Sequence, residues 1–226
     1  MNVTFLKWGA GSLALLVCAA GGTTVLAQDP SSSQSSPAAS TPAAAPEKKA
    51  DPSIAQRKEN QQDRIANGIK SGELTPGETA NLEKKEAAIN KETRTDRAAN
   101  GGKLTSAEKA QVNQQQNQMS KQIYADKHNA STAHYGNNKV GQRRENQQDR
   151  IAQGVKSGQL TAGETAKLEK QQKGINKQVA SDRKANGGTL TASEKKQVNK
   201  EQNQASRNIY RKKHNAATQP GAKPKQ

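Results

Sequence analysis

Residues 64–78 read RIANGIKSGELTPGE, and residues 150–164 repeat the pattern as RIAQGVKSGQLTAGE. Both stretches belong to a longer duplication, in which residues 57–130 align without a gap onto residues 143–216. The two copies are identical at 48 of the 74 aligned positions, which indicates duplication of a unit rather than shared composition. We therefore expect two tandem copies of one structural unit.

Each copy contains the pattern Gly-x-Leu-Thr-x-x-Glu twice, and this pattern predicts the start of a helix. The threonine can act as the N-cap, and the glutamate three residues later can accept a hydrogen bond from the threonine N–H, which completes a capping box. Glycines just before each pattern can end the preceding helix in a left-handed conformation. The predicted caps are Thr75, Glu78, Thr105, Glu108, Thr161, Glu164, Thr191 and Glu194.

These signals predict an all-α fold of two tandem three-helix repeats, loosely packed, with a disordered N-terminal linker and a disordered C-terminal tail. The apolar residues form a narrow seam with seven-residue spacing, as from Leu82 to Ile89 and from Leu168 to Ile175. Such a seam is typical of a coiled coil and not of a wide core face. The predicted helices span residues 54–70, 76–99, 106–128, 143–156, 162–185 and 192–214.

The N-terminal residues resemble an export signal. Lys7 precedes an apolar run that includes residues 13–17, and Val25-Leu26-Ala27 offers a site for a signal peptidase. We expect cleavage after Ala27, no transmembrane helix after cleavage, and a periplasmic or secreted protein. Lipidation at Cys18 and an uncleaved anchor are the alternatives. We therefore predict the following domains along the chain: a signal peptide 1–27, a disordered Ser/Pro/Ala linker 28–53, repeats 54–130 and 143–217 joined by a linker 131–142, and a basic tail 218–226.

The chain without its signal is strongly basic and poor in large apolar residues. It keeps 35 Lys and Arg against 20 Asp and Glu, and only 19 of its 199 residues are Leu, Ile, Val or Phe. So small an apolar content predicts marginal stability. The absence of cysteine after cleavage excludes disulfides and thiolate chemistry. The charge favours an anionic lipid, a glycan or another polyanion as partner, although solubility alone is a simpler explanation.

The Gly-x-Leu-x-x-x-Glu spacing also resembles the second half of an EF-hand loop, in which glycine makes the turn and glutamate binds calcium. The positions that should supply the early oxygen ligands instead hold residues such as Arg97 and Arg183. We therefore predict no metal site. A degenerate EF-hand-like module that responds to divalent cations is one alternative, and a largely disordered solvating protein is another.

His128 and His214 occupy equivalent positions, each four residues after a tyrosine, Tyr124 or Tyr210. Each pair should stack on one helix face, with the tyrosine as a core contact and the histidine as part of a cationic helix end. No hydrolase, nucleotide-binding or zinc-protease motif occurs, so we predict no catalytic residue, no cofactor and no enzyme. The scarcity of aromatic residues argues against nucleic acid as the partner.

Two motifs resemble those of a group of exported bacterial helical-repeat proteins. One is the run at residues 64–78 and 150–164, and the other is the ending Ile-Tyr-x-x-Lys-His-Asn at residues 123–129 and 209–215. The resemblance covers both repeats, and it implies export and a helical fold but no particular activity. We expect a non-catalytic exported protein that binds an anionic envelope component or a protein partner.

Overall fold

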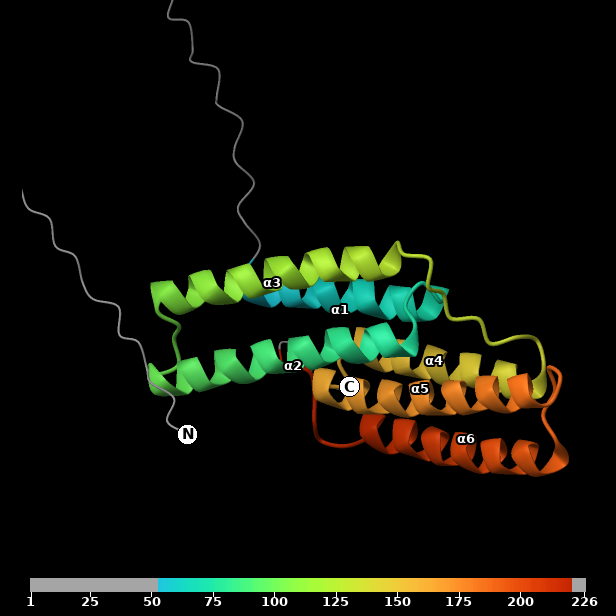
Figure 1. Cartoon of the computed structure of the whole chain (residues 1–226). Helices are drawn as coiled ribbons and strands as arrows, with labels where there is room; N and C mark the ends of the chain where they lie inside the picture. The colour runs from blue at the N-terminus through green and yellow to red at the C-terminus, as the bar shows by residue number, and fades with distance from the viewer. Residues whose placement is uncertain (1–52, 221–226) are drawn as a thin grey trace, which may run out of the picture. The chain divides into compact units, whose positions relative to one another are not determined.

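The computed structural model of the chain describes residues 53–220. The predicted signal peptide, the linker up to residue 52 and the tail from residue 221 lie outside the described residues. Residues 53–220 contain six α-helices and no strand (Figure 1), which confirms the all-α class and the two three-helix repeats. The helices are α1 (Ile54–Ser71), α2 (Pro76–Ala99), α3 (Ser106–Lys127), α4 (Lys139–Lys156), α5 (Ala162–Ala185) and α6 (Ala192–Lys213).

Five of these helices begin where the sequence predicts, and α2 and α5 match the prediction at both ends. The exception is α4, which begins at Lys139, inside the predicted linker 131–142. The Asn138 side-chain oxygen accepts a hydrogen bond from the Gly141 N–H at 3.1 Å, and Val140 is buried in the interior. The second repeat therefore becomes helical before residue 143, because its cap lies upstream of the duplicated residues.

Local capping explains the helix starts. In α2 the Thr75 hydroxyl accepts a hydrogen bond from the Glu78 N–H at 3.3 Å, and the Glu78 carboxylate accepts one from the Thr75 N–H at 2.9 Å. The same reciprocal pair begins α3, α5 and α6, so all four predicted capping boxes are confirmed. Gly72 ends α1 with a φ of 74°, the left-handed conformation that glycine adopts without strain.

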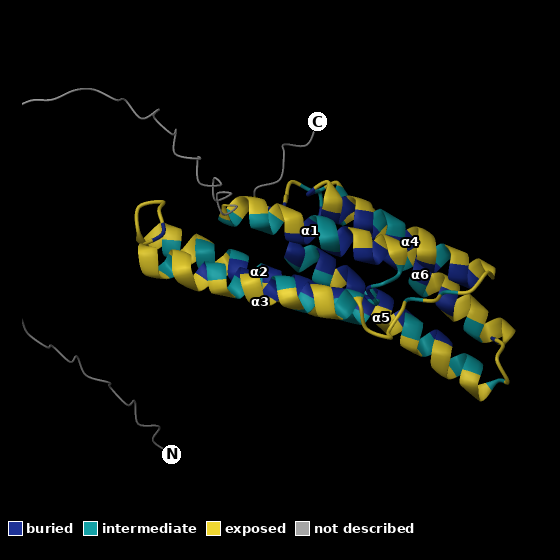
Figure 2. Cartoon of the chain, turned by 90° about the horizontal axis from the view of Figure 1, so that it is seen from above, coloured by how far each residue is buried: buried dark blue, intermediate teal, exposed yellow. Residues whose placement is uncertain are grey.

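Each repeat is a three-helix unit in which the third helix packs on the other two. Helix α3 contacts α1 and α2, and α6 contacts α4 and α5. The repeats join through two further pairings, α2 with α5 and α1 with α4 (Figure 1). Figure 2 shows the buried residues along the inner helix faces and the exposed residues along the outer ones. The first two helices of each repeat thus form the interface, while α3 and α6 do not contact each other.

One hydrophobic core is shared by both repeats. It includes three equivalent pairs, Ile65 and Ile151, Leu82 and Leu168, and Ile123 and Ile209, all at most 2 % exposed. Smaller clusters lie beyond it, around Ile89, Leu104 and Val112 in the first repeat and around Val140, Ile175, Val179, Leu190, Val198 and Ala205 in the second. The residues of the predicted seam are therefore buried.

Glutamine side chains complete the interior where large apolar residues are scarce. The Gln61 Nε2 donates to the Gln116 carbonyl at 2.6 Å, and the Gln116 Nε2 donates to the Ile54 carbonyl at 2.9 Å, which joins α1 to α3. The equivalent Gln147 and Gln202 join α4 to α6 in the same way. Because a buried N–H donor without an acceptor is costly, the bonds made by these Nε2 atoms specify which helix faces meet.

Candidate functional site

The motif at residues 64–78 builds the corner between α1 and α2. A Cβ atom on Gly68 would come within 2.7 Å of the Leu74 side chain, which is fully buried. The Leu74 N–H also donates to the Gly68 carbonyl at 3.0 Å. Gly154 and Leu160 make the same close contact in the second repeat, where the Cβ would approach to 2.6 Å. The motif therefore serves folding, since its residues form a turn, a cap and a core contact.

The glutamates of the first capping box in each repeat also anchor the end of the third helix. The Glu78 Oε1 accepts a hydrogen bond from the Asn129 Nδ2 at 2.7 Å, while its Oε2 serves the Thr75 cap. Glu164 accepts from Asn215 in the same way, at 2.6 Å. Both oxygens of each carboxylate thus have protein partners. Within residues 53–220 no group of three or more His, Cys, Asp and Glu residues is placed to hold a metal ion.

The tyrosines of the Ile-Tyr-x-x-Lys-His-Asn endings lie on the surface. Tyr124 and Tyr210 are 64 % and 63 % exposed, so the prediction that they are core contacts is wrong. The isoleucine before each one fills the core, and the helical turn directs the next side chain outward. Each tyrosine does stack on its histidine as predicted, with ring centroids 4.1 Å apart for His128 and 4.2 Å apart for His214.

Three carboxyl groups are buried in the interior, those of Glu83, Glu86 and Glu169, and two of them occupy equivalent positions in the repeats. Glu83 in α2 and its equivalent Glu169 in α5 are fully buried, and each accepts one hydrogen bond, from Gln62 at 3.4 Å and from Gln148 at 3.0 Å respectively. The Oε1 atom of each has no hydrogen-bond partner. Burial raises the pKa of Glu169 to about 8, and burial together with the nearby Glu86 raises the pKa of Glu83. Protonated carboxyl groups therefore suit this interior.

An open cleft at the outer end of the second repeat collects basic side chains. It lies between the start of α4, the end of α5 and the start of α6, and its volume is about 680 Å³. The buried Val140 and Leu190 form its apolar part. No Asp or Glu is among the residues that line it, which are Asn138, Lys139, Val140, Arg143, Arg183, Gly188, Thr189, Leu190, Lys195 and Asn199.

The basic positions of this cleft recur in the first repeat. Arg143, Arg183 and Lys195 are equivalent to Arg57, Arg97 and Lys109. None of the six belongs to the apolar core. The guanidinium group of Arg143 also donates a hydrogen bond to Asn203 at 3.1 Å, which joins α4 to α6, and Arg57 joins α1 to α3 in a similar way. The recurrence of basic residues at these positions is visible in the sequence, but their meeting in one cleft is not, because they lie on three different helices. None of Arg143, Arg183 and Lys195 was predicted as a binding residue.

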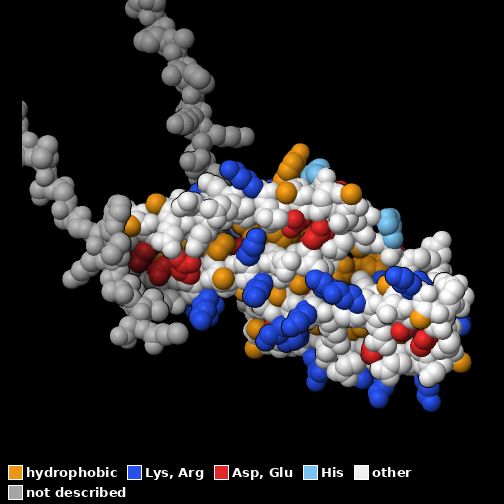
Figure 3. Space-filling view, in the orientation of Figure 1, with side chains coloured by type: hydrophobic (Ala, Val, Ile, Leu, Met, Phe, Trp, Pro, Cys, Tyr) orange, Lys and Arg blue, Asp and Glu red, His pale blue; other side chains and the backbone are white. Residues whose placement is uncertain are grey.

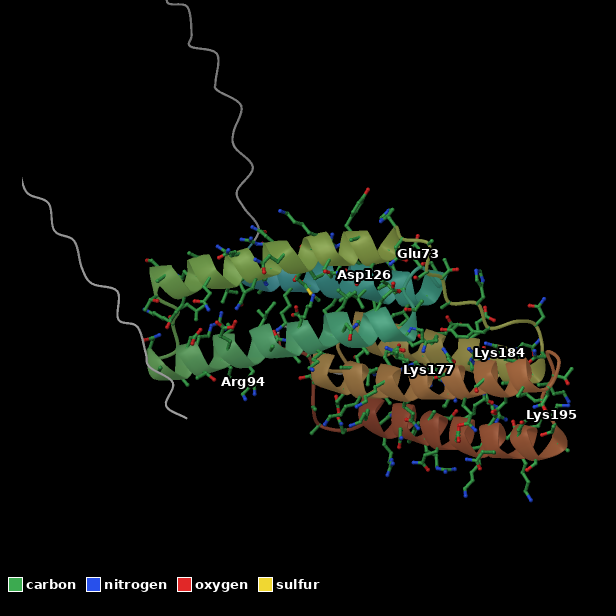
Figure 4. All side chains as sticks on the ribbon, in the orientation of Figure 1. Glu73, Arg94, Asp126, Lys177, Lys184 and Lys195 are labelled. Atoms are coloured by element: carbon green, nitrogen blue, oxygen red, sulfur yellow. The ribbon has the colours of Figure 1, made fainter. Side chains whose placement is uncertain are left out.

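The outward face of α6 extends this basic surface. Helix α6 carries seven basic and two acidic residues, against three basic and two acidic residues in α3. An open groove of about 860 Å³ follows α6, and Lys195 and Asn199 line both the groove and the cleft. Figure 3 shows basic side chains along the lower edge of the protein, over α6, and Figure 4 labels Lys195 at the start of this helix.

The basic residues near the C-terminal end of the sequence divide between this helix and the predicted tail. Arg207, Arg211, Lys212 and Lys213 belong to α6, whereas Lys223 and Lys225 lie outside the described residues.

Comparison with known proteins found no protein family, no curated protein and no solved structure that matches the chain. The resemblance to exported bacterial helical-repeat proteins thus stays a prediction. Among the helices of residues 53–220, none combines the length and the apolar character needed to cross a membrane.

Proposed function

We propose that the protein is a non-catalytic binding protein whose second repeat holds a polyanion. The observation that carries this proposal is the cleft lined by Lys139, Arg143, Arg183 and Lys195 without an acidic residue. Cations gathered around a concave site focus its field and raise the local concentration of anions. The two guanidinium groups can also form paired hydrogen bonds with carboxylate, sulfate or phosphate.

The difference between the two repeats supports the second one as the binding side. In α6 the residues Lys196, Lys200, Arg211 and Lys212 stand where α3 has Ala110, Gln114, Ala125 and Asp126. None of these positions is buried in either helix. Lys212 forms an ion pair with Glu164 of α5 at 3.6 Å. The other three substitutions change what the surface attracts without changing how the helix packs. If the positive charge served solubility alone, it would not need to be concentrated on one of the two equivalent helices.

A charge-neutralising triple variant tests the proposal, and the duplication supplies its matched control. The test variant is Arg143→Gln/Arg183→Gln/Lys195→Gln, and the control is Arg57→Gln/Arg97→Gln/Lys109→Gln, which removes the same net charge from the first repeat. Binding of the full chain to labelled polygalacturonate and to long-chain polyphosphate is measured by fluorescence anisotropy over a range of salt concentrations.

We expect the test variant to bind at least about tenfold more weakly at low salt and to show a shallower salt dependence, because fewer counterions are released. The control variant should lose less. Equal losses in both variants would show that net charge alone governs binding. Binding that does not respond to salt, or no binding by the unmodified chain, would refute the proposed function.

The proposed function also places the protein outside the cytoplasm. This location is inferred from the predicted signal peptide. Mass spectrometry of the protein from its native host should give Gln28 as the first residue. An intact Met1 or a lipid on Cys18 would contradict cleavage after Ala27.

A further inference from the structure

The exposed face of α6 carries a line of polar side chains that ends at an aromatic ring. This line, the α6 stripe, consists of Lys196, Lys200, Asn203, Arg207, Tyr210 and His214, all of them exposed. Its members follow one another at intervals of three or four residues, which places them on one side of the helix. At a rise of 1.5 Å per residue the stripe is about 27 Å long, the length of several units of an extended polymer.

The stripe continues the basic cleft. Lys200, Asn203 and Arg207 line the groove along α6. Lys195 and Asn199 line that groove and the cleft as well. A linear ligand held in the cleft can therefore lie along α6 without leaving the basic surface.

Tyr210 supplies a fixed ring at the far end of the stripe. His214 covers one side of the ring, with a centroid distance of 4.2 Å and an angle of 26° between the ring planes. The His214 Nδ1 lies 2.7 Å from the Tyr210 carbonyl oxygen, which fixes the imidazole in place. Since Tyr210 is 63 % exposed, its uncovered side faces solvent. The ring is thus a flat surface ready to stack on a flat ligand.

Two arginines lie near Tyr210 in the sequence of α6. Arg207 precedes Tyr210 by one helical turn, and Arg211 follows it directly. Each donates one hydrogen bond to a neutral amide, to Gln204 and Asn208 respectively, both at 2.7 Å. The amide orients each guanidinium, and the remaining N–H groups stay available to a carboxylate or sulfate. Arg207 therefore offers an anion-binding group on the helix face of Tyr210, one turn earlier, and Arg211 offers one on the adjoining face.

A ring-bearing anion fits this arrangement better than other polyanions do. Proteins that bind single-stranded nucleic acid stack successive bases on several aromatic side chains, whereas this stripe has one exposed tyrosine in its whole length. A membrane surface would need apolar side chains to insert, and Tyr210 is the single large exposed hydrophobic residue that α6 offers. A sugar ring has an apolar C–H face for the tyrosine and hydroxyl groups for amides such as Asn199 and Asn203.

We propose that the α6 stripe and the adjoining cleft bind an acidic polysaccharide, an inference that rests on the proposed function. One sugar ring stacks on Tyr210, and Arg207 and Arg211 hold the acidic groups. The first repeat has the same Tyr124–His128 stack, but Ala125 stands in the place of Arg211 and Asp126 follows it. The first repeat therefore has the ring without the two guanidinium groups, and Lys121 stands in the place of Arg207.

The test compares Tyr210→Ala with Tyr124→Ala and Tyr210→Phe in the full chain. The probes are polygalacturonate, which carries acidic sugar rings, and long-chain polyphosphate, which has charge but no rings. Because stacking on one aromatic side chain contributes substantially to binding, Tyr210→Ala should weaken polygalacturonate binding at least about fivefold. Polyphosphate binding should change less than about twofold. Tyr124→Ala and Tyr210→Phe should bind both probes like the unmodified chain, since both retain the Tyr210 ring position.

The outcomes separate this inference from the proposed function. If polygalacturonate and polyphosphate both bind and Tyr210→Ala affects neither, the function holds and the stacking site is refuted. Equal weakening of both probes refutes it too. If neither polymer binds at low salt, the proposed function itself fails. Tighter, Tyr210-dependent binding of single-stranded DNA, or of vesicles rich in phosphatidylglycerol, would replace the polysaccharide with that partner.

Discussion

Replacing the buried Glu169 by glutamine should make the protein more stable at neutral pH. Glutamine has nearly the shape of a protonated glutamate, and its amide N–H can donate where the protonated carboxyl would. Burial raises the pKa of Glu169 in the folded protein from its ordinary value of 4.5 to about 8. The folded state therefore keeps a proton that the unfolded chain releases above pH 4.5.

The sign and size of the effect follow from proton linkage. Between pH 4.5 and pH 8 the folded state holds one more proton than the unfolded chain, so the free energy of unfolding falls as the pH rises. At 1.36 kcal/mol for each pKa unit the fall over this range is about 5 kcal/mol, and about 3 kcal/mol of it has occurred by pH 7. This cost is large beside the whole stability of a typical domain. Glu83, whose pKa burial also raises, adds a loss in the same direction.

Urea unfolding followed by circular dichroism, at pH values from about 4 to 9, measures the effect. The Glu169→Gln protein should match the unmodified chain near pH 4 and exceed its stability by about 3 kcal/mol at pH 7. The double variant Glu83→Gln/Glu169→Gln should show the flattest pH profile. Glu59→Gln, at an exposed position of α1, is the control and should leave the profile unchanged. If Glu169→Gln keeps the full pH dependence, Glu169 is not the carboxyl group responsible and the burial argument is refuted.

The remaining predictions concern the local structure and calcium. Thr75→Ala removes a confirmed cap and should lower the free energy of unfolding by about 1 kcal/mol, as measured by urea unfolding; an unchanged midpoint would show that the cap contributes little. Gly68→Ala should destabilise the protein by about 1–2 kcal/mol, because its Cβ would meet the buried Leu74. Gly174→Ala, with open space around it, should stabilise the protein by up to about 1 kcal/mol. A Gly68→Ala protein more stable than the Gly174→Ala protein would refute the corner contact. Millimolar calcium should leave the circular-dichroism spectrum unchanged, since the capping glutamates already bind protein donors; micromolar binding by calorimetry would favour the EF-hand-like alternative.

The candidate site could be predicted only in part. The excess of basic residues on the C-terminal helix is visible in the sequence, and so is the pairing of each tyrosine with a histidine one turn later. The cleft is not, because Arg143, Arg183 and Lys195 come from three helices and meet only after those helices pack. The exposure of Tyr210 was predicted wrongly, since composition suggested that so rare a large side chain would be needed in the core.

The sequence by itself determined the helices, because their boundaries depend on contacts between neighbouring residues. A threonine and a glutamate three positions apart form a cap whatever the rest of the chain does, and Gly72 ends α1 for an equally local reason. Tertiary structure decided the pairing of α2 with α5 and of α1 with α4. The apolar seam is too narrow to specify those partners, and the interior is completed by buried groups such as Gln61 and Glu169. A polar side chain of this kind is stable inside a protein only when distant residues supply its hydrogen bonds and exclude water, so its burial follows from the packing and not from the local sequence.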